Sequence, residues 1–250
     1  MYPEGNAMTT ILVTGGTGTL GKLVVPALGD AKVRVLSRNA NGPGRFACDL
    51  MTGEGLAPAV DGADVIVHLA GGPKGDDVAT ANLVRAAERA GTGHLVFISV
   101  IAADAVPLGY FRRKHEAEKL VAASDVPSTI LRAAQFHGFC LNAVRAVAKL
   151  PIVPVPAVNF QPVDVREVAE RIARLALSDP AGRVRDLAGP TVYRMGELVD
   201  KYLRASGRRR PKMPLRIPGA AGKVYRADGN LNLDADTGVR TFEDYLAEQF

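Results

Sequence analysis

The chain has 250 residues, 47% of them hydrophobic, and a formal net charge of +5 at pH 7. This length fits one large domain or a domain with an attached lobe, and the apolar fraction suffices for a sizeable core. No apolar run reaches the ~18 residues that a transmembrane helix needs, so we expect no membrane partner.

The excess of positive charge is confined to one short segment of the second half. Six residues form this basic cluster: Arg204, Arg208, Arg209, Arg210, Lys212 and Arg216. Such a cluster favours a solvated loop, with an anion-attracting rim as the alternative. Because the remaining sequence is not basic, we expect no nucleic-acid partner.

The cysteines and the first residues bear on compartment and processing. Cys48 and Cys140 are too few for a disulfide framework, which favours a cytoplasmic protein. His137 lies near Cys140, but no second Cys/His pair stands at ligand spacing, so we expect no metal. Residues 1–7 lack the basic and apolar segments of a signal peptide. We expect them to be a disordered extension of one domain over residues 8–250.

Short apolar segments alternate with helical patterns through the first half. The predicted strands are 11–14, 33–37, 45–48, 65–69, 95–99 and 128–131. The predicted helices are 20–28, 55–60, 76–90 and 110–123. This alternation predicts an α/β fold with a doubly wound, Rossmann-like parallel sheet. Asp76 or Asp77 is the expected N-cap of the third helix, and Gly91 its stop.

A glycine turn joins the first strand to the first helix. Gly15 permits the tight turn, Gly18 lets the backbone approach a pyrophosphate, and Gly21 lets the helix pack closely on the strand. The N–H groups that open a helix bind anions, so the turn predicts a dinucleotide site. The alternative is a glycine-rich turn in another kind of α/β protein. The residues assigned to the cofactor here are Gly15, Thr17, Gly18, Thr19, Leu20 and Gly21.

The spacing of this turn, G-x-x-G-x-x-G preceded by Thr14, resembles the atypical and extended short-chain dehydrogenase/reductase superfamily. The similarity is greatest to its NmrA-like, NAD(P)H-binding branch. The second strand ends at Leu36-Ser37-Arg38, without the acidic residue that binds the ribose of NAD. Arg38 offers donors suited to a 2′-phosphate and Ser37 adds a hydroxyl, so NADP is favoured over NAD. The alternative for Arg38 is a simple exposed loop residue.

The ends of the next two strands match the same superfamily. The resemblance implies that Asp49 and Leu50 lie near the adenine. It also implies that the ribose and nicotinamide lie against the backbone of Leu69, Ala70 and Gly71. His68 before this turn is expected to be a packed strand residue. Asn82 stands where relatives carry a helix asparagine.

Tyr110 and Lys114 form a Tyr-x-x-x-Lys pair on one face of the predicted helix 110–123. In the superfamily this lysine binds the nicotinamide ribose and lowers the pKa of the tyrosine, which acts as general acid or base. The alternative places Tyr110 in the entry loop, with Lys114 extending to the surface. Ser99 is the candidate for the substrate-binding serine, although Val100 and Ile101 replace the serines that relatives often carry.

The strand 128–131 leads into a segment that resembles the family's L-R-P-x-x-F pattern, with Ala133 in place of the proline. The resemblance implies that Ala133 flanks the nicotinamide and makes Gln135, Phe136 and His137 candidates to line a substrate pocket. The alternative is that these three side chains only fill space. In the second half we expect a proline-punctuated loop around 151–162 and helices over 166–177, 195–205 and 242–250. A small substrate lobe is expected from about 134–160 and 185–250.

These expectations predict an NADP-dependent oxidoreductase for a small organic carbonyl or alkene, as a monomer or a homodimer. The resemblance also allows a redox-sensing regulator that binds NADP without turnover. A sugar-nucleotide epimerase or dehydratase is the third alternative, for which the C-terminal lobe is short.

Overall fold

The computed structural model describes residues 8–38, 42, 44–72 and 74–250, so the expected extension over residues 1–7 lies outside it. The chain divides into two compact units. The N-terminal unit comprises Met1–Ile98, Glu116–Ile130 and Ala169–Val184. The C-terminal unit comprises Ser99–His115, Leu131–Val168 and Arg185–Phe250. Within the described residues, no helix is both long and apolar enough to cross a membrane.

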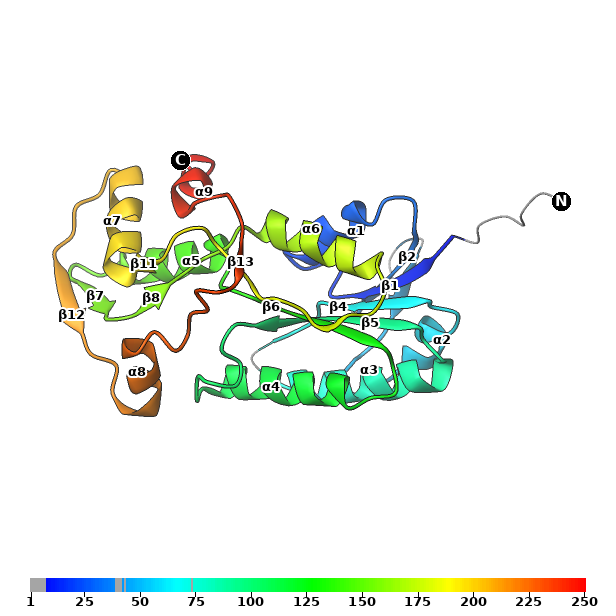
Figure 1. The fold of residues 1–250 in the computed structure, drawn as a ribbon. Coiled ribbons are helices and arrows are strands. Elements are labelled where there is room, and N and C mark those ends of the chain that lie inside the picture. Colours follow the sequence, from blue (N-terminus) through cyan, green and yellow to red (C-terminus); the bar gives the residue numbers. More distant parts are fainter. Residues whose placement is uncertain (1–7, 39–41, 43, 73) are drawn as a thin grey trace. The chain divides into compact units, whose positions relative to one another are not determined.

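A parallel sheet forms the centre of the N-terminal unit, in the order β3-β2-β1-β4-β5. Every residue of β1 is buried, as expected for a parallel strand covered on both faces. Figure 1 shows α1 on one side of this sheet and α3 on the other. The predicted doubly wound fold is therefore confirmed. The strands are β1 Thr10–Thr14, β2 Lys32–Ser37, β3 Arg45–Ala47, β4 Val65–His68, β5 His94–Val100, β6 Ser128–Ala133 and β9 Gly182–Arg183.

The helices of the first half lie close to their predicted bounds. They are α1 Gly21–Ala27, α2 Leu56–Val60, α3 Asp76–Ala90 and α4 Gly109–Ala122. The expected N-cap of α3 is wrong, because Gly75 takes that position at φ 75° and Asp76 is already helical. Only glycine adopts this left-handed conformation without strain. Gly91, at φ 64°, ends α3 as predicted.

The C-terminal unit packs three helices around its own apolar cluster. Leu141 of α5, Leu198 of α7 and Phe242 of α9 are almost fully buried there. The helices of this unit, including α6, which continues into the N-terminal unit, are α5 His137–Val147, α6 Val165–Ala176, α7 Met195–Ala205, α8 Gly219–Arg226 and α9 Phe242–Ala247. Helix α9 is thus shorter than the predicted helix over 242–250, and α5 and α8 are not predicted at all.

The proline-punctuated segment is not simply a loop. Strand β7 (Val153–Pro156) pairs in parallel with β12 (Lys212–Leu215), and β8 (Asn159–Phe160) pairs with β11 (Tyr193–Arg194). Each of these sheets has two strands, so one side of every strand needs no backbone donor and proline is tolerated there. Short strands β10 (Leu187–Ala188) and β13 (Asp236–Thr237) complete the unit.

Candidate active site

The glycine turn has the geometry of a phosphate-binding turn. Gly15 has φ 68°, and a Cβ on it would lie 2.7 Å from the backbone nitrogen of Ala70. A Cβ on Gly21 would lie 2.2 Å from the carbonyl oxygen of Gly15. These two positions therefore require glycine for packing. Among the described residues, the only atom that a Cβ on Gly18 would meet within 4 Å is the Gly15 oxygen at 3.2 Å, which leaves space above Gly18 for a ligand.

The turn is exposed where a pyrophosphate is expected. Thr17, Gly18 and Thr19 are exposed, whereas Leu20 is buried beneath them. The backbone N–H of Gly18 donates to the carbonyl oxygen of Gly15 (2.9 Å) and closes the turn. The turn fits a pyrophosphate, with backbone N–H groups and threonine hydroxyls as its donors.

A buried chain of hydrogen bonds links three segments at the ends of β1, β4 and the start of α3. The hydroxyl of Thr14 lies 2.7 Å from Nδ1 of His68, and Nε2 of His68 lies 3.0 Å from the hydroxyl of Thr80. The backbone N–H of Ala70 donates to Thr14 (3.1 Å), and Thr80 donates to the carbonyl oxygen of Asp76 (2.7 Å). His68 is fully buried, which confirms it as a packed strand residue.

One assignment of donors and acceptors satisfies every group in this series of hydrogen bonds. Thr14 accepts from Ala70 and donates to Nδ1 of His68, and Nε2–H of His68 donates to Thr80. This is a neutral imidazole with its proton on Nε2. The glycine turn and the turn after β4 are thereby held to each other. Sequence patterns give no indication of this link, because Thr14 and Thr80 lie far apart in the chain.

The turn after β3 is held by α3. Nδ2 of Asn82 donates to the carbonyl oxygens of Leu50 (2.9 Å) and Met51 (3.0 Å). Oδ1 of Asp49 accepts from the backbone N–H of Met51 (2.8 Å). Asn82 therefore positions the segment in which Asp49 and Leu50 are expected to meet the adenine.

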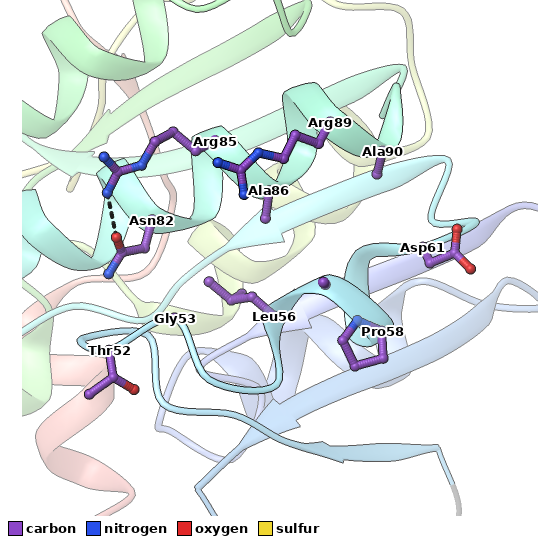
Figure 2. A pocket seen from close by; sticks show the side chains of 11 residues that line it. Thr52, Gly53, Leu56, Pro58, Asp61, Asn82, Arg85, Ala86, Arg89 and Ala90 are labelled. Carbon is purple, nitrogen blue, oxygen red and sulfur yellow. Dashed lines mark hydrogen bonds between the residues drawn. The ribbon is translucent and has the colours of Figure 1, made fainter.

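A cavity of about 660 Å³ lies between α2 and α3, with Arg85 and Arg89 on one side and Leu56 and Pro58 on the other (Figure 2). Nη2 of Arg85 donates to Oδ1 of Asn82 (2.6 Å). The glycine turn contributes nothing to its lining. We therefore do not assign the cofactor to this cavity.

Arg38 and Ser37 lie at the end of β2. Arg38 is exposed and Ser37 is half-buried. The residues that follow, 39–41, are outside the described part of the chain. An exposed guanidinium at this position is accessible to a 2′-phosphate, which is the role that the sequence predicts for it.

In the C-terminal unit, β5 ends in a buried serine and a strained turn. The Ser99 side chain is 5% exposed, and its Oγ has no hydrogen-bond partner within the described residues. Ala102 follows at φ 63°, a left-handed conformation that costs an alanine roughly 1–3 kcal/mol. An unsatisfied buried hydroxyl beside backbone strain is typical of a functional site.

Tyr110 and Lys114 lie one turn apart on α4. Lys114 is 4% exposed, and Ala117 and Val121 on the same face are fully buried, so this part of the helix face points inward. Tyr110 is 39% exposed and contacts Phe111 edge-on, with 5.5 Å between ring centroids. Helix α4 thus carries a buried lysine one turn from an accessible tyrosine.

The segment after β6 shows where the remaining candidates lie. Ala133 is buried at the end of β6, and Gln135 and Phe136 are half-buried before α5. Nε2 of His137 bonds to the carbonyl oxygen of Pro162 (2.9 Å), and burial lowers the pKa of this histidine against the opposing effect of Asp164. Pocket-lining roles for Gln135, Phe136 and His137 stay predictions.

The chain is similar to an NAD(P)H-binding family and to two curated reductases. A family model described as NAD(P)H-binding matches residues 15–138. The (4-alkanoyl-5-oxo-2,5-dihydrofuran-3-yl)methyl phosphate reductase of Streptomyces griseus is 30% identical over 222 residues, which cover 83% of this chain and 76% of the relative. Quinone oxidoreductase 2 of Escherichia coli is 24% identical over 252 residues, covering 92% and 87%.

A solved structure gives the same picture of the fold. The NADPH complex of an Escherichia coli NADPH-dependent quinone oxidoreductase has a TM-score of 0.80 at 21% identity and covers 96% of this chain and 99% of its own. The chain therefore belongs to a family of NAD(P)H-binding proteins. The reductase relatives and the NAD(P)H-binding model together support an oxidoreductase that uses NAD(P)H.

Proposed function

We propose that this oxidoreductase reduces a small organic molecule at a carbonyl group or at an alkene conjugated to one. The observation that carries the proposal is the inward-facing Lys114 one helical turn from the accessible phenol of Tyr110. The names of the two relatives support the substrate class, because a quinone and a 4-alkanoyl-5-oxo-dihydrofuran both contain carbonyl groups conjugated with carbon–carbon double bonds.

The chain's own residues would divide the chemistry as follows. The bound dinucleotide supplies the hydride. Tyr110 donates a proton from its phenol to the substrate oxygen, and Lys114 stabilises the phenolate that remains. The unsatisfied hydroxyl of Ser99 hydrogen-bonds the same oxygen. Because Val100 and Ile101 carry no hydroxyl, Ser99 fills this role alone.

Cofactor binding is proposed to use four short segments and two single residues, Ala133 and Lys114. The glycine turn binds the pyrophosphate, and Arg38 with Ser37 binds the 2′-phosphate that distinguishes NADPH from NADH. Asp49 and Leu50 meet the adenine. Leu69, Ala70, Gly71 and Ala133 form the surface for the ribose and nicotinamide, and Lys114 also holds the ribose.

A regulator that binds NADP without turnover is the second candidate. The observation that favours it is the replacement of the usual serines by Val100 and Ile101, both of which are buried. Absorbance at 340 nm separates the two functions, with NADPH and a panel of ketones and quinones. The enzyme oxidises NADPH in the presence of at least one substrate. A protein that binds NADPH tightly but oxidises none of the panel is the regulator.

A further inference from the structure

A hollow of about 720 Å³ lies within the C-terminal unit, apart from the residues assigned above. This cationic pocket is bounded by β7, β12, α8 and the start of α7. Its volume is within the range of small-molecule sites, roughly 300–1,000 Å³. The pocket is therefore large enough for an organic ligand of modest size.

Apolar groups make up most of its wall. Val155 and Pro156 of β7, Pro214 of β12 and the ring of Tyr225 of α8 all line it. Tyr225 is half-buried, and its burial raises the pKa of the phenol. Such a wall accommodates an apolar body rather than a free inorganic ion.

Three cations lie among these apolar groups, with one carboxylate. Arg194, Lys212 and Arg226 line the pocket, and Asp228 is the single acidic residue. Asp228 accepts a hydrogen bond from Nδ2 of Asn159 (2.7 Å), and Lys212 is paired with Asp200 (2.5 Å).

The two arginines keep donors for a ligand. Among the described residues no carboxylate forms an ion pair with Arg194 or Arg226, and Arg226 uses one nitrogen on the carbonyl oxygen of Ile217 (2.9 Å). A guanidinium has five N–H donors in a planar fork that matches phosphate and carboxylate. The pocket thus presents unpaired positive charge beside an apolar wall.

We infer that the cationic pocket binds an organic anion, whose phosphate or carboxylate meets Arg194 and Arg226 and whose apolar body packs on Val155, Pro156 and Tyr225. Lys212 belongs to the basic cluster, so one member of that cluster serves a binding site. The other members of the basic cluster do not line the pocket, so a substitution among them serves as a control for the loss of charge.

Calorimetry with octyl phosphate tests the binding directly. Octyl phosphate should bind at least 10-fold more tightly than either octanol or inorganic phosphate, because only it satisfies both the apolar wall and the arginines. Arg226→Gln and Arg194→Gln should each weaken it about 10-fold. Arg209→Gln, an exposed arginine of the basic cluster outside the pocket lining, should leave it unchanged. Equal binding of octanol, or equal loss in Arg209→Gln, overturns the inference.

Discussion

The hydroxyl of Thr14 lies 2.7 Å from Nδ1 of His68, across the neighbouring ends of the parallel strands β1 and β4. Both residues are fully buried. The glycine turn follows one of them and the turn of Leu69 to Gly71 follows the other. The bond therefore holds together two segments to which we assign the dinucleotide.

Replacing Thr14 by valine keeps the shape of the side chain and removes this link. His68 and the N–H of Ala70 both lose a buried partner, so the free energy of unfolding should fall by about 1–3 kcal/mol. The affinity for NADPH should fall about 10-fold, because the two turns lose their common anchor. Urea unfolding and calorimetry measure the two effects.

Thr129→Val is a matched control for this variant. Thr129 is equally buried, bonds to Nε2 of His94 (2.8 Å) and accepts from the backbone N–H of Ala181 (3.0 Å), but at the beginning of its strand. It should lose comparable stability and keep its affinity for NADPH. If both variants weaken NADPH alike, the Thr14–His68 bond has only a structural role.

Two substitutions in the glycine turn should have different effects, one on cofactor binding and the other on stability. Gly18→Val should abolish NADPH binding with little change in stability, because the added side chain enters the open space expected for the pyrophosphate. Gly21→Ala should unfold at a lower temperature, because its Cβ would meet the Gly15 oxygen at 2.2 Å. Circular dichroism follows the melting, and calorimetry the cofactor. Unchanged NADPH binding by Gly18→Val would place the phosphates elsewhere.

Arg38 should decide between the two dinucleotides. Arg38→Ala is expected to weaken NADPH about 10-fold or more and NADH very little, since only NADPH carries the 2′-phosphate that a guanidinium binds strongly. Lys32→Ala removes an exposed charge from the other end of β2 and is the control. Equal affinities of the parent protein for NADPH and NADH would contradict the assignment.

Tyr110→Phe should lower turnover by roughly 10²–10⁴ and leave NADPH affinity nearly intact, because only the proton donor is lost. Lys114→Ala should damage both turnover and NADPH affinity. Lys119→Ala, on the exposed side of α4 in a pair with Glu116, should change neither. Turnover of Tyr110→Phe within a few-fold of the parent would point to another proton source.

Ser99→Ala should behave differently from a typical buried polar deletion. Its Oγ has no partner among the described residues, so the variant should be at least as stable as the parent. Turnover should still fall, though less than in Tyr110→Phe. A clear loss of stability would mean that the hydroxyl has a structural partner in solution.

The C-terminal unit should lose stability in acid. Burial alone raises the pKa of Asp164, but hydrogen bonds from Arg166 outweigh it and hold the pKa below its usual value. Burial also lowers the pKa of His137 below 6.5. In both cases the unfolded chain binds more protons, so stability is present at higher pH and lost as the pH falls.

As the pH falls below about 6.5, protonation of His137 lowers the stability first. Protonation of Asp164 lowers it further below about pH 4. Urea unfolding at pH 7 and pH 5 should show a smaller loss for His137→Gln than for the parent. His94 of the N-terminal unit, whose pKa is also lowered by burial, accounts for part of the remaining loss of stability of the whole protein. An identical pH dependence of His137→Gln and parent would show that this imidazole is not held neutral by folding.

Local sequence determined the N-terminal sheet and its cofactor turn. Buried parallel strands are continuous apolar runs, such as Ile11 to Val13, and these are readable without any partner. Gly15 is required by its positive φ within the turn and also by the backbone of Ala70, which comes from a distant segment. The need for Gly21 arises within one strand–turn–helix unit, so its role follows from spacing. Tyr110 and Lys114 share a helix face for the same reason, because their separation is one helical turn.

Only the tertiary structure decided what depends on distant segments. The Thr14–His68–Thr80 chain, the unsatisfied Ser99 hydroxyl and the left-handed Gly75 cap all result from packing between elements. Pro154 alone argues against a strand, but the structure pairs it with a residue of β12. Arg194 and Arg226 become one site because β7, β12 and α8 fold around a common hollow, and no local pattern encodes that meeting.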